Sequence, residues 1–366
     1  MKIGILTYPF NHNYGGYLQA YALLSVLKKH SFDVYLIDRK TNRKSFSFVE
    51  KTKGYINKYI LNRPAIYSEK TRKDYFEYRG SAILPFVDSK IAPRTISLYS
   101  SEDLVKIEQY HFDAIIVGSD QIWRSSYLPN IEDFYLDFSK EWSIKRIAYA
   151  ASFGTEEPEY TDDKREKCGI LLKKFNAVSV REKSGVTLIN EIYQWGISGV
   201  QTVLDPTMLL SPSDYFKLFP HLKYSKKRIF CYILDMDKKK KEYAKFIAQE
   251  LGCSPYFFLP ENRKEVLPSI EDFLSGIANS EFVLTDSFHG TVFSIIFNIP
   301  FRVFGNEMRG LARITDLLSM FDLSSCLVSN SSRLNHENIS YKWDSVNQIL
   351  NSEREKSLSF LLNNLS

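Results

Sequence analysis

The sequence predicts an α/β protein with two Rossmann-like domains that face a cleft. Short apolar runs, typical of buried parallel strands, alternate with stretches in which apolar residues recur at helical spacing. This alternation starts at Lys2 and starts again after Asp205-Pro206. The chain has 366 residues, which is enough for two domains, since domains cluster at roughly 100–200 residues.

The first half of the chain follows a βαβ plan. Residues 2–8 are a predicted strand and residues 17–31 a predicted helix with apolar residues at helical spacing. The loop between them contains Gly15 and Gly16, and such a loop at a helix N-terminus can cradle phosphates. Further predicted strands are residues 34–38, 114–117, 146–152 and 177–182.

The second half begins at a predicted junction at residues 200–206. The strands predicted there are residues 228–235, 255–259, 282–286 and 300–304, and the helices are residues 238–251, 270–278 and 309–321. The lysines at 238–241 are expected on the solvated face of their helix. We therefore place the first domain at residues 1–200 and the second at 201–342. A last helical stretch, residues 343–366, is expected to pack back on the first domain.

Residues 39–100 form a basic, aromatic-rich insertion in the first domain. From Arg39 to Arg94 there are 14 Lys and Arg against 5 Asp and Glu, whereas the rest of the chain has 34 against 38. One interpretation is a solvated helical insertion. The other is a surface that attracts an anionic partner, either a phospholipid face or a phosphate-bearing acceptor. Nucleic acid is not expected as a partner, because no recognition motif accompanies the charge.

The cysteines and the N-terminal segment bear on the compartment. The four cysteines form no CxxC pair and have no histidine at metal-ligand spacing, so we expect free thiols in a reducing compartment and no metal site. The first residues lead directly into a strand without a signal-peptide pattern. No run approaches the ~18 apolar residues that span a membrane. We therefore expect a cytoplasmic protein.

The stretch 282–298 is where we expect the chemistry. An apolar strand leads to Asp286 and Ser287, and His289 opens a short apolar helix. Hydroxyl and carboxylate side chains in this position cap the unpaired N–H groups of a helix. A strand that turns directly into a helix forms an anion site at the carboxyl edge of an α/β sheet. His289 stands at this entrance and can carry a proton near neutral pH.

Other candidate ligand groups follow strands of the first domain. Asp120 comes after the strand at 114–117, where open α/β sheets keep their ligand groups. The loop after the first strand supplies a set of candidate phosphate contacts, namely Asn13, Tyr14, Gly15 and Gly16. The alternative for this loop is that its glycines only permit a tight turn.

Three arginines are candidates for holding an anion. Arg181 stands at the end of an apolar strand, where a guanidinium can hold a phosphate or carboxylate through two parallel hydrogen bonds. The alternative is an ion pair with a neighbouring Glu or Asp at the surface of the protein. Arg309 and Arg313 are four residues apart and share one face of a predicted helix. They would surround a small polyanion together with His289, unless they make ordinary helix salt bridges, for example with Asp316.

These segments, taken in order, resemble the polysaccharide pyruvyl transferase family over most of the chain. The likeness lies in the order and spacing of ILTYPFNHNYGGYLQAYAL, DAIIVGSDQIW, AYAASFG, SVREKSG, VLDPTMLL and TDSFHGTVFSIIFNIPF with NEMRGLARITDLL. The resemblance implies a GT-B-like pair of Rossmann domains, with phosphoenolpyruvate as donor and a sugar diol of a bacterial surface glycan as acceptor. The product would be a cyclic pyruvate ketal, and no cofactor is expected besides the donor substrate.

The resemblance also implies roles for site residues. In family members an arginine at the position of Arg181 and an Arg-x-His pair bind the donor. This chain has Ser287-Phe288-His289 at the second place, so a serine replaces the arginine of the pair. We hypothesise that Arg309 or Arg313 supplies the missing cation. His289 would handle the proton of the reaction.

The resemblance also implies which kind of acceptor the protein uses. The sugar would belong to a surface polysaccharide or its lipid-linked precursor, which would bring the protein into peripheral contact with the inner face of the membrane. Asp120 or Asp286 would orient His289 or activate the acceptor hydroxyl.

Two other functions remain open. One is a GT-B glycosyltransferase that uses a nucleotide sugar. The other is a non-catalytic relative in a glycan-assembly complex, in which Ser287 marks the loss of the donor site.

Overall fold

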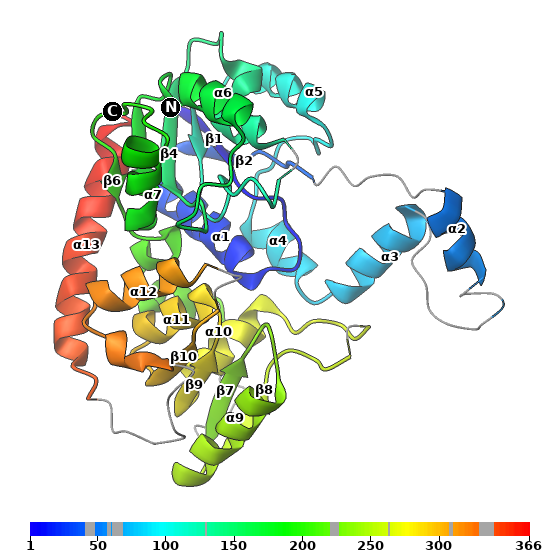
Figure 1. Ribbon diagram of the computed structural model, residues 1–366, viewed down its shortest axis with the longest axis vertical. Helices are drawn as coiled ribbons and strands as arrows, with labels where there is room; N and C mark the ends of the chain where they lie inside the picture. The colour runs from blue at the N-terminus through cyan, green and yellow to red at the C-terminus, as the bar shows by residue number, and fades with distance from the viewer. Residues whose placement is uncertain are drawn as a thin grey trace.

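Two parallel sheets, each covered by helices, lie one beyond the other in the computed structural model (Figure 1). The structure describes residues 1–40, 48–56, 60, 69–128, 130–219, 227–262, 264–306, 310–328 and 340–366. The predicted α/β class with two Rossmann-like domains is confirmed. The polypeptide passes from the first sheet to the second between Thr202 and Arg228.

The first sheet has the strand order β2-β1-β3-β4-β5-β6, and all its neighbouring strands are parallel. Its strands are β1 (Lys2–Leu6), β2 (Asp33–Leu36), β3 (Ala114–Val117), β4 (Lys145–Ala151), β5 (Ala177–Val180) and β6 (Gln201–Thr202). Its α-helices are α1 (Tyr14–Lys29), α2 (Phe48–Tyr55), α3 (Glu69–Arg79), α4 (Leu84–Lys90), α5 (Ser101–Leu104), α6 (Asp162–Leu172) and α7 (Lys183–Thr187). Shorter turns are η2 (Val105–Tyr110), η3 (Ile131–Tyr135), η4 (Asp137–Ser139), η5 (Leu188–Ile192) and η6 (Pro206–Leu209). The central strand β3 is buried along its whole length, as its continuous apolar run requires.

The second sheet has the order β11-β10-β9-β7-β8 and is also parallel. Its strands are β7 (Arg228–Tyr232), β8 (Ser254–Phe257), β9 (Phe282–Thr285), β10 (Phe301–Phe304) and β11 (Leu327–Val328). The helices of this part of the chain are α8 (Pro212–Phe216), α9 (Lys238–Glu250), α10 (Ile270–Ala278), α11 (Phe288–Ile296) and α12 (Leu311–Met320), with a short turn η8 (Ser324–Cys326). A capping box between Ser269 and Asp272 starts α10 where the sequence pattern places it.

The C-terminal helix α13 (Trp343–Asn363) runs from the second domain back along the first (Figure 1). The Ser357 hydroxyl accepts a hydrogen bond of 3.0 Å from the Leu204 amide, and Arg354 Nε donates to the Met208 carbonyl at 2.8 Å. Phe360 lies against Tyr149 of β4. These contacts join the second domain to the first through the end of the chain.

Helix α1 begins three residues earlier than the predicted helix. The Asn13 side chain accepts a hydrogen bond from the Gly15 amide, so it caps the first turn. Tyr14, Gly15 and Gly16 therefore belong to the helix and not to the loop that the sequence pattern placed them in. The prediction was wrong here because two glycines lower helical propensity, whereas the cap and the packing of this turn favour the helix.

The strand orders decide where a ligand can bind. In the first sheet the chain leaves β1 for β2 on one side and returns to β3 on the other, so the order reverses between β1 and β3. The second sheet reverses between β7 and β9 in the same way. Open α/β sheets hold ligands outside the carboxyl ends of the strands at such points. The residues that follow these four strands are therefore candidate ligand groups.

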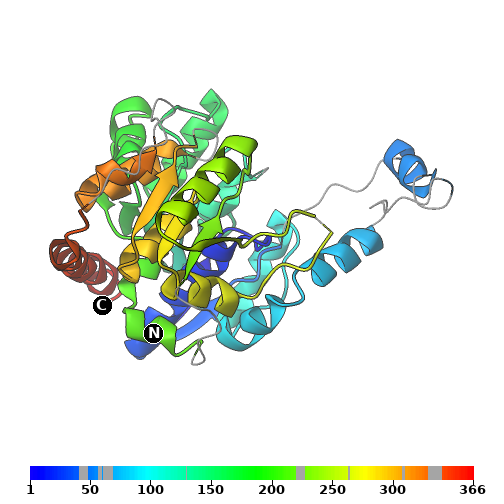
Figure 2. The same ribbon diagram turned by 90° about the horizontal axis from the view of Figure 1, so that it is seen from below.

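Helices α2 and α3 leave the body of the first domain and project to one side. Both views show this projection, which we call the arm (Figures 1 and 2). The arm comprises α2, α3 and the described residues Ile56 and Ile60. It lies inside the basic insertion that the charge pattern predicts.

Candidate active site

A cavity of about 290 Å³ lies between the two domains, at both reversal points. Its wall is formed by residues that follow three strands, namely β1 (Tyr8, Asn11, His12, Asn13), β3 (Asp120, Gln121, Tyr127) and β9 (Asp286, Ser287, Phe288, His289). Tyr232 at the end of β7, Leu234 after it, and Arg313 and Ile314 from α12 complete the wall. The cleft expected between the domains is thus present. The cavity brings together residues that are far apart in the sequence because both sheets present their carboxyl ends to it.

His289 is held in the first turn of α11 by the second domain. The Thr285 hydroxyl donates to the Tyr232 carbonyl at 2.7 Å, which ties the end of β9 to β7. Ser287 caps α11, since its hydroxyl accepts from the Gly290 amide at 3.5 Å. The His289 ring therefore enters the domain interface from a fixed helix end.

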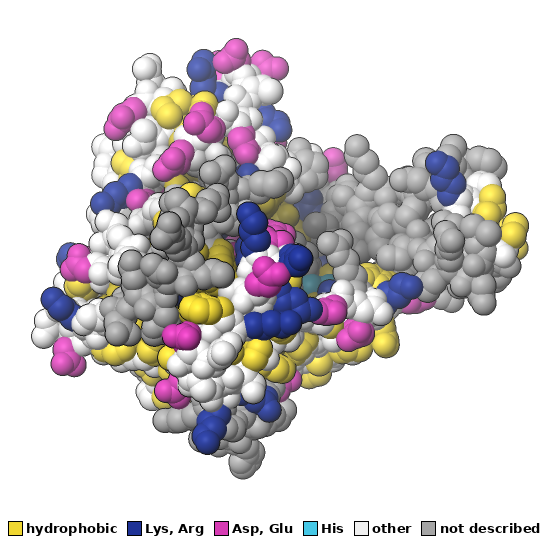
Figure 3. Space-filling view, turned by 60° about the horizontal axis from the view of Figure 1, so that its bottom comes forward, with side chains coloured by type: hydrophobic (Ala, Val, Ile, Leu, Met, Phe, Trp, Pro, Cys, Tyr) yellow, Lys and Arg dark blue, Asp and Glu magenta, His cyan; other side chains and the backbone are white. Residues whose placement is uncertain are grey.

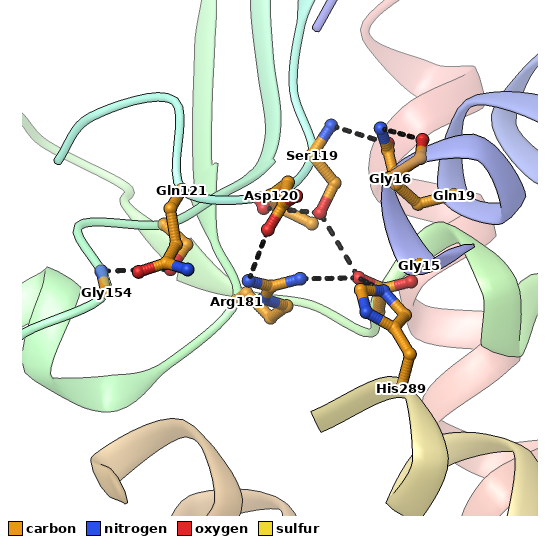
Figure 4. A network of polar contacts seen from close by, with 12 residues as sticks. Gly15, Gly16, Gln19, Ser119, Asp120, Gln121, Gly154, Arg181 and His289 are labelled. Carbon is orange, nitrogen blue, oxygen red and sulfur yellow. Dashed lines mark hydrogen bonds and ion pairs between the residues drawn. The ribbon is translucent and has the colours of Figure 1, made fainter. Parts of the chain in front are cut away.

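Across the interface, His289 meets Gly15 of the first domain and Asp205, which follows β6 of the first sheet. Its Nε2 lies 3.5 Å from Oδ2 of Asp205, an ion pair when the imidazole is protonated. Its other ring nitrogen lies against Gly15, because a Cβ built on Gly15 would lie only 1.9 Å from His289 Nδ1. In Figure 4 the side chain of His289 points toward Gly15 and toward the group around Arg181. Only glycine at position 15 lets the ring approach this closely.

Gly15→Ala is therefore expected to displace His289 and to lower the rate of any reaction at this site by at least about tenfold. A catalytic group that is misplaced by 1 Å can lower a reaction rate by up to ~100-fold. Gly16→Ala is the matched control. A Cβ at Gly16 would have its nearest neighbour at 3.6 Å, which is an ordinary contact. Steady-state rates of both variants, with thermal unfolding of each, test this. Equal rates for the two variants would contradict the placement of His289.

Arg181 lies at the centre of a buried group of carboxylates. Its Nη1 donates to Oδ2 of Asp205 at 2.7 Å, and Nη2 lies 3.5 Å from Asp120 (Figure 4). Glu182 lies 3.9 Å from Arg181 Nε. Arg181 lies outside the cavity lining, whereas Asp120 is part of it. Arg181 thus makes ion pairs, as the alternative predicted, but they are buried and not at the surface.

The charges in this group stabilise one another. Burial lowers the pKa of the Arg181 guanidinium, but the carboxylates of Asp205, Asp120 and Glu182 outweigh it and raise that pKa. For Asp205, burial raises the pKa, whereas His289, Arg181 and Thr207 together lower it well below the usual range of a carboxyl group. Asp205 is therefore an ionised carboxylate between a guanidinium and an imidazole.

Arg313 is the arginine that reaches the cavity. The Phe288 ring has Arg181 4.4 Å from its centroid and Arg313 5.6 Å from it, so the ring contacts both cations. Burial, which has the larger effect, and the nearby charge of Arg181 lower the pKa of Arg313 to about 10. Arg313 is thus still a cation at neutral pH, and it lines the cavity together with Ser287 and His289. Arg309, the other candidate, lies outside the described residues.

The other predicted contacts have different surroundings. Asn13 lines the cavity and its Nδ2 donates to Asp120 at 3.4 Å. Tyr14 is buried between the domains, where its hydroxyl donates to the Pro268 carbonyl at 2.6 Å and its ring stacks on Phe273. Gly15 and Gly16 are buried in the first turn of α1 and are not part of the cavity lining.

Asp286 is held by structural contacts. Its carboxylate accepts from the amides of Leu234 and Asp235 at 2.6 and 3.1 Å and from Lys240 Nζ at 2.8 Å. These bonds fix the loop after β7 at the edge of the cavity. They also correct the expectation for Lys240, whose side chain is only 14% exposed and leaves the solvated face of α9. Of the two carboxylates predicted to serve the chemistry, Asp120 has the weaker contacts.

Asp205 was not among the predicted site residues, because the sequence pattern places it in a domain junction. Asp205 accepts from the Thr207 amide and hydroxyl at 3.0 and 2.7 Å and so caps η6. A signal was present, because Asp205 follows the apolar residues Val203-Leu204 as Asp120 follows β3. A carboxylate at the carboxyl edge of a parallel sheet is a candidate ligand group in both cases.

The residues that the structure describes contain neither a cluster of metal ligands nor a helix that could span a membrane. Within them, no three His, Cys, Asp or Glu side chains gather as ligands for a metal ion. Among the same residues, no helix combines the length and the apolar character needed to cross a membrane.

The chain is similar to a known protein family and, distantly, to several solved structures. The family model for polysaccharide pyruvyl transferase matches residues 13–308. A search of curated proteins gives no match. Among solved structures, the chain is similar to the UDP-GlcNAc 2-epimerase from Methanocaldococcus jannaschii, with 11% identity, a TM-score of 0.49 and 96% and 92% of the two chains covered. It is also similar to Medicago truncatula UGT71G1 complexed with UDP-glucose, with 10% identity, a TM-score of 0.49 and 99% and 97% covered.

Proposed function

Because this chain belongs to the polysaccharide pyruvyl transferase family and is therefore a transferase, we propose that it transfers the pyruvyl group of phosphoenolpyruvate to a sugar diol as a cyclic ketal. The observation that supports this most is the meeting of Arg313, His289 and the N-terminus of α11 in one interdomain cavity. A cation, a proton carrier and a helix N-terminus are what an enol phosphate with a carboxylate requires.

The donor would bind with its anionic groups toward α11 and α12. The N-terminus of α11 attracts anions through its N–H groups and its dipole. Arg313 would supply the cation that other members carry at the position of Ser287, since both residues line the same cavity. Arg181 would act indirectly, because it binds Asp205 and lies against the ring of Phe288.

The reaction needs a proton on the methylene carbon of the donor and a stabilised cation at the carbon that bears phosphate. His289 would give the proton, and the ionised Asp205 beside Nε2 stabilises the protonated imidazole. One sugar hydroxyl then attacks the cationic carbon and loses its proton to Asp120 in the cavity wall. The second hydroxyl displaces the phosphate, which takes up the remaining proton. Phosphate and a ketal are the products.

The acceptor would be a sugar of a bacterial surface polysaccharide or of its lipid-linked precursor. The rings of Tyr8 and Tyr127 line the cavity, and aromatic rings offer an apolar face on which a sugar can lie. A lipid-linked acceptor would require peripheral contact of the protein with the inner face of the membrane. The direct test is phosphate release from phosphoenolpyruvate in the presence of surface-glycan repeat units. Release that none of the glycans accelerates would contradict the proposal.

Donor binding can be tested without the acceptor. Phosphoenolpyruvate at about 100 times its Kd should stabilise the protein by about 2.7 kcal/mol and raise the melting temperature by several degrees. Arg313→Met should abolish this rise, whereas Arg165→Met, on the surface of α6, should keep it. Stabilisation by nucleoside diphosphates and none by phosphoenolpyruvate would favour a glycosyltransferase instead. No stabilisation by either would favour a non-catalytic relative.

A further inference from the structure

The arm is the strongest feature that the transfer reaction does not use. It projects from the first domain (Figures 1 and 2), and the stretch 48–79, from the start of α2 to the end of α3, has 8 Lys and Arg against 4 Asp and Glu. The described lysines Lys51 and Lys53 of α2 are exposed, and Lys73 of α3 has a side chain that is 75% exposed. Lys73 is paired with Glu77 at 3.6 Å, but basic residues still outnumber acidic ones in the arm, which gives it a net positive charge.

The same arm exposes large apolar side chains. Ile60 is 69% exposed, Tyr55 and Tyr78 are each 57% exposed, and Ile56 is 39% exposed. Single exposed apolar residues are common on protein surfaces, but Tyr55, Ile56 and Ile60 lie within ten residues of Lys51 and Lys53. Figure 3 shows basic and hydrophobic side chains near one another at the far end of the arm. Basic and apolar groups on one element are the composition of segments that bind anionic membranes.

The root of the arm joins the cavity. The Phe76 ring of α3 stacks on His12 at 4.0 Å between centroids, and the His12 Nε2 lies at hydrogen-bond distance, 3.0 Å, from the Phe76 carbonyl. His12 itself lines the cavity. At the end of α3, the Arg79 carbonyl accepts from the Leu267 amide of the second domain at 2.9 Å. The root of the arm thus lies beside the cavity, while α2 lies at the far end of the arm (Figure 1).

We propose that the arm docks on an anionic phospholipid bilayer, with Lys51 and Lys53 at the headgroups and Ile56 and Ile60 in the interfacial layer. A bilayer fits because it offers negative charge and an apolar layer to the same element. A second copy of this chain would instead bring two basic arms together. The inference rests on the proposed function only for its purpose, which is to deliver a lipid-linked acceptor to the cavity.

The test is co-sedimentation of the full chain with vesicles of equal parts phosphatidylglycerol and phosphatidylcholine, compared with phosphatidylcholine alone. Binding to the anionic vesicles and release at high ionic strength are expected, because salt screens exposed charges. Each lysine near an anionic surface contributes about fivefold to binding, so Lys51→Glu with Lys53→Glu should reduce binding at least about tenfold. Lys238→Glu with Lys239→Glu, on exposed α9, makes the same charge change away from the arm and should bind as the wild type does.

A second pair of variants tests the apolar part. Ile56→Ser with Ile60→Ser should weaken vesicle binding while leaving its salt dependence in place. Equal loss of binding from the arm and the α9 variants would overturn the proposal. So would a change of oligomeric state in light scattering that only the arm variants show, since that would assign the arm to a second copy.

The result is independent of the proposed reaction. If the wild type binds anionic vesicles through the arm but releases no phosphate from phosphoenolpyruvate with any glycan, the membrane surface stands and the reaction does not. If a soluble glycan accelerates phosphate release and the arm variants bind vesicles as the wild type does, the reaction stands and the membrane surface does not.

Discussion

His289→Ala should lower turnover by at least about 100-fold, the usual size of a general acid–base contribution. The imidazole lines the cavity and faces an ionised carboxylate, Asp205. Its removal would leave the methylene carbon of the donor without a proton source. Phosphate release with donor and acceptor present measures the effect.

Folding must be checked alongside the rate, because the His289 ring fills space against Gly15. His289→Gln keeps a polar side chain of similar reach and should be as inactive as His289→Ala while unfolding near the wild-type temperature. His30→Ala, at the exposed end of α1, should keep full activity. Substantial turnover by folded His289→Gln would remove the histidine from the chemistry.

Asp205→Asn should destabilise the protein by about 3–5 kcal/mol near neutral pH, the usual cost of breaking a buried ion pair on one side. Asn can still accept from Thr207, but its amide would set N–H groups against the Nη1 of Arg181, now bonded at 2.7 Å. The guanidinium would keep only the longer contacts to Asp120 and Glu182. This is a large part of the 5–15 kcal/mol that stabilises a typical protein.

The pH dependence of this effect has a definite sign. The pKa of Asp205 is lowered in the folded protein, so its contribution is present above the unfolded value of about 3.9 and is lost as pH falls toward the folded value. The stability difference between wild type and Asp205→Asn should thus be greatest near neutral pH and narrow below about pH 4. Urea unfolding at several pH values measures it. Asp162→Asn, an exposed site, should change stability by no more than about 0.5 kcal/mol, and a similarly small change for Asp205→Asn would contradict the buried pair.

The main elements were predictable because local signals agreed with one another. The strand at 114–117 and the helix at 270–278 have the predicted bounds, since a continuous apolar run and a capping box define them without help from distant residues. The start of α1 was not predicted, because two glycines hid a helix that Asn13 caps. The prediction that Lys240 is exposed to solvent was also wrong, because it considered α9 alone. Its position on α9 indicates solvent, but Asp286 of another element draws its ammonium inward.

The sequence by itself determined the two α/β domains, the stretch that carries His289, the serine at position 287 and the basic insertion. Each of these depends on residues that are near one another in the chain. The tertiary structure alone decided that Asp205 is the carboxylate beside His289, that Arg313 lines the cavity, and that Arg181 holds carboxylates. The physical reason is that His289 and Arg313 belong to the second domain and meet residues of the first, while Asp120 and Asp205 are distant from Arg181 in the sequence. Their contacts depend on how α11 docks against α1 and η6, and no local periodicity carries that information.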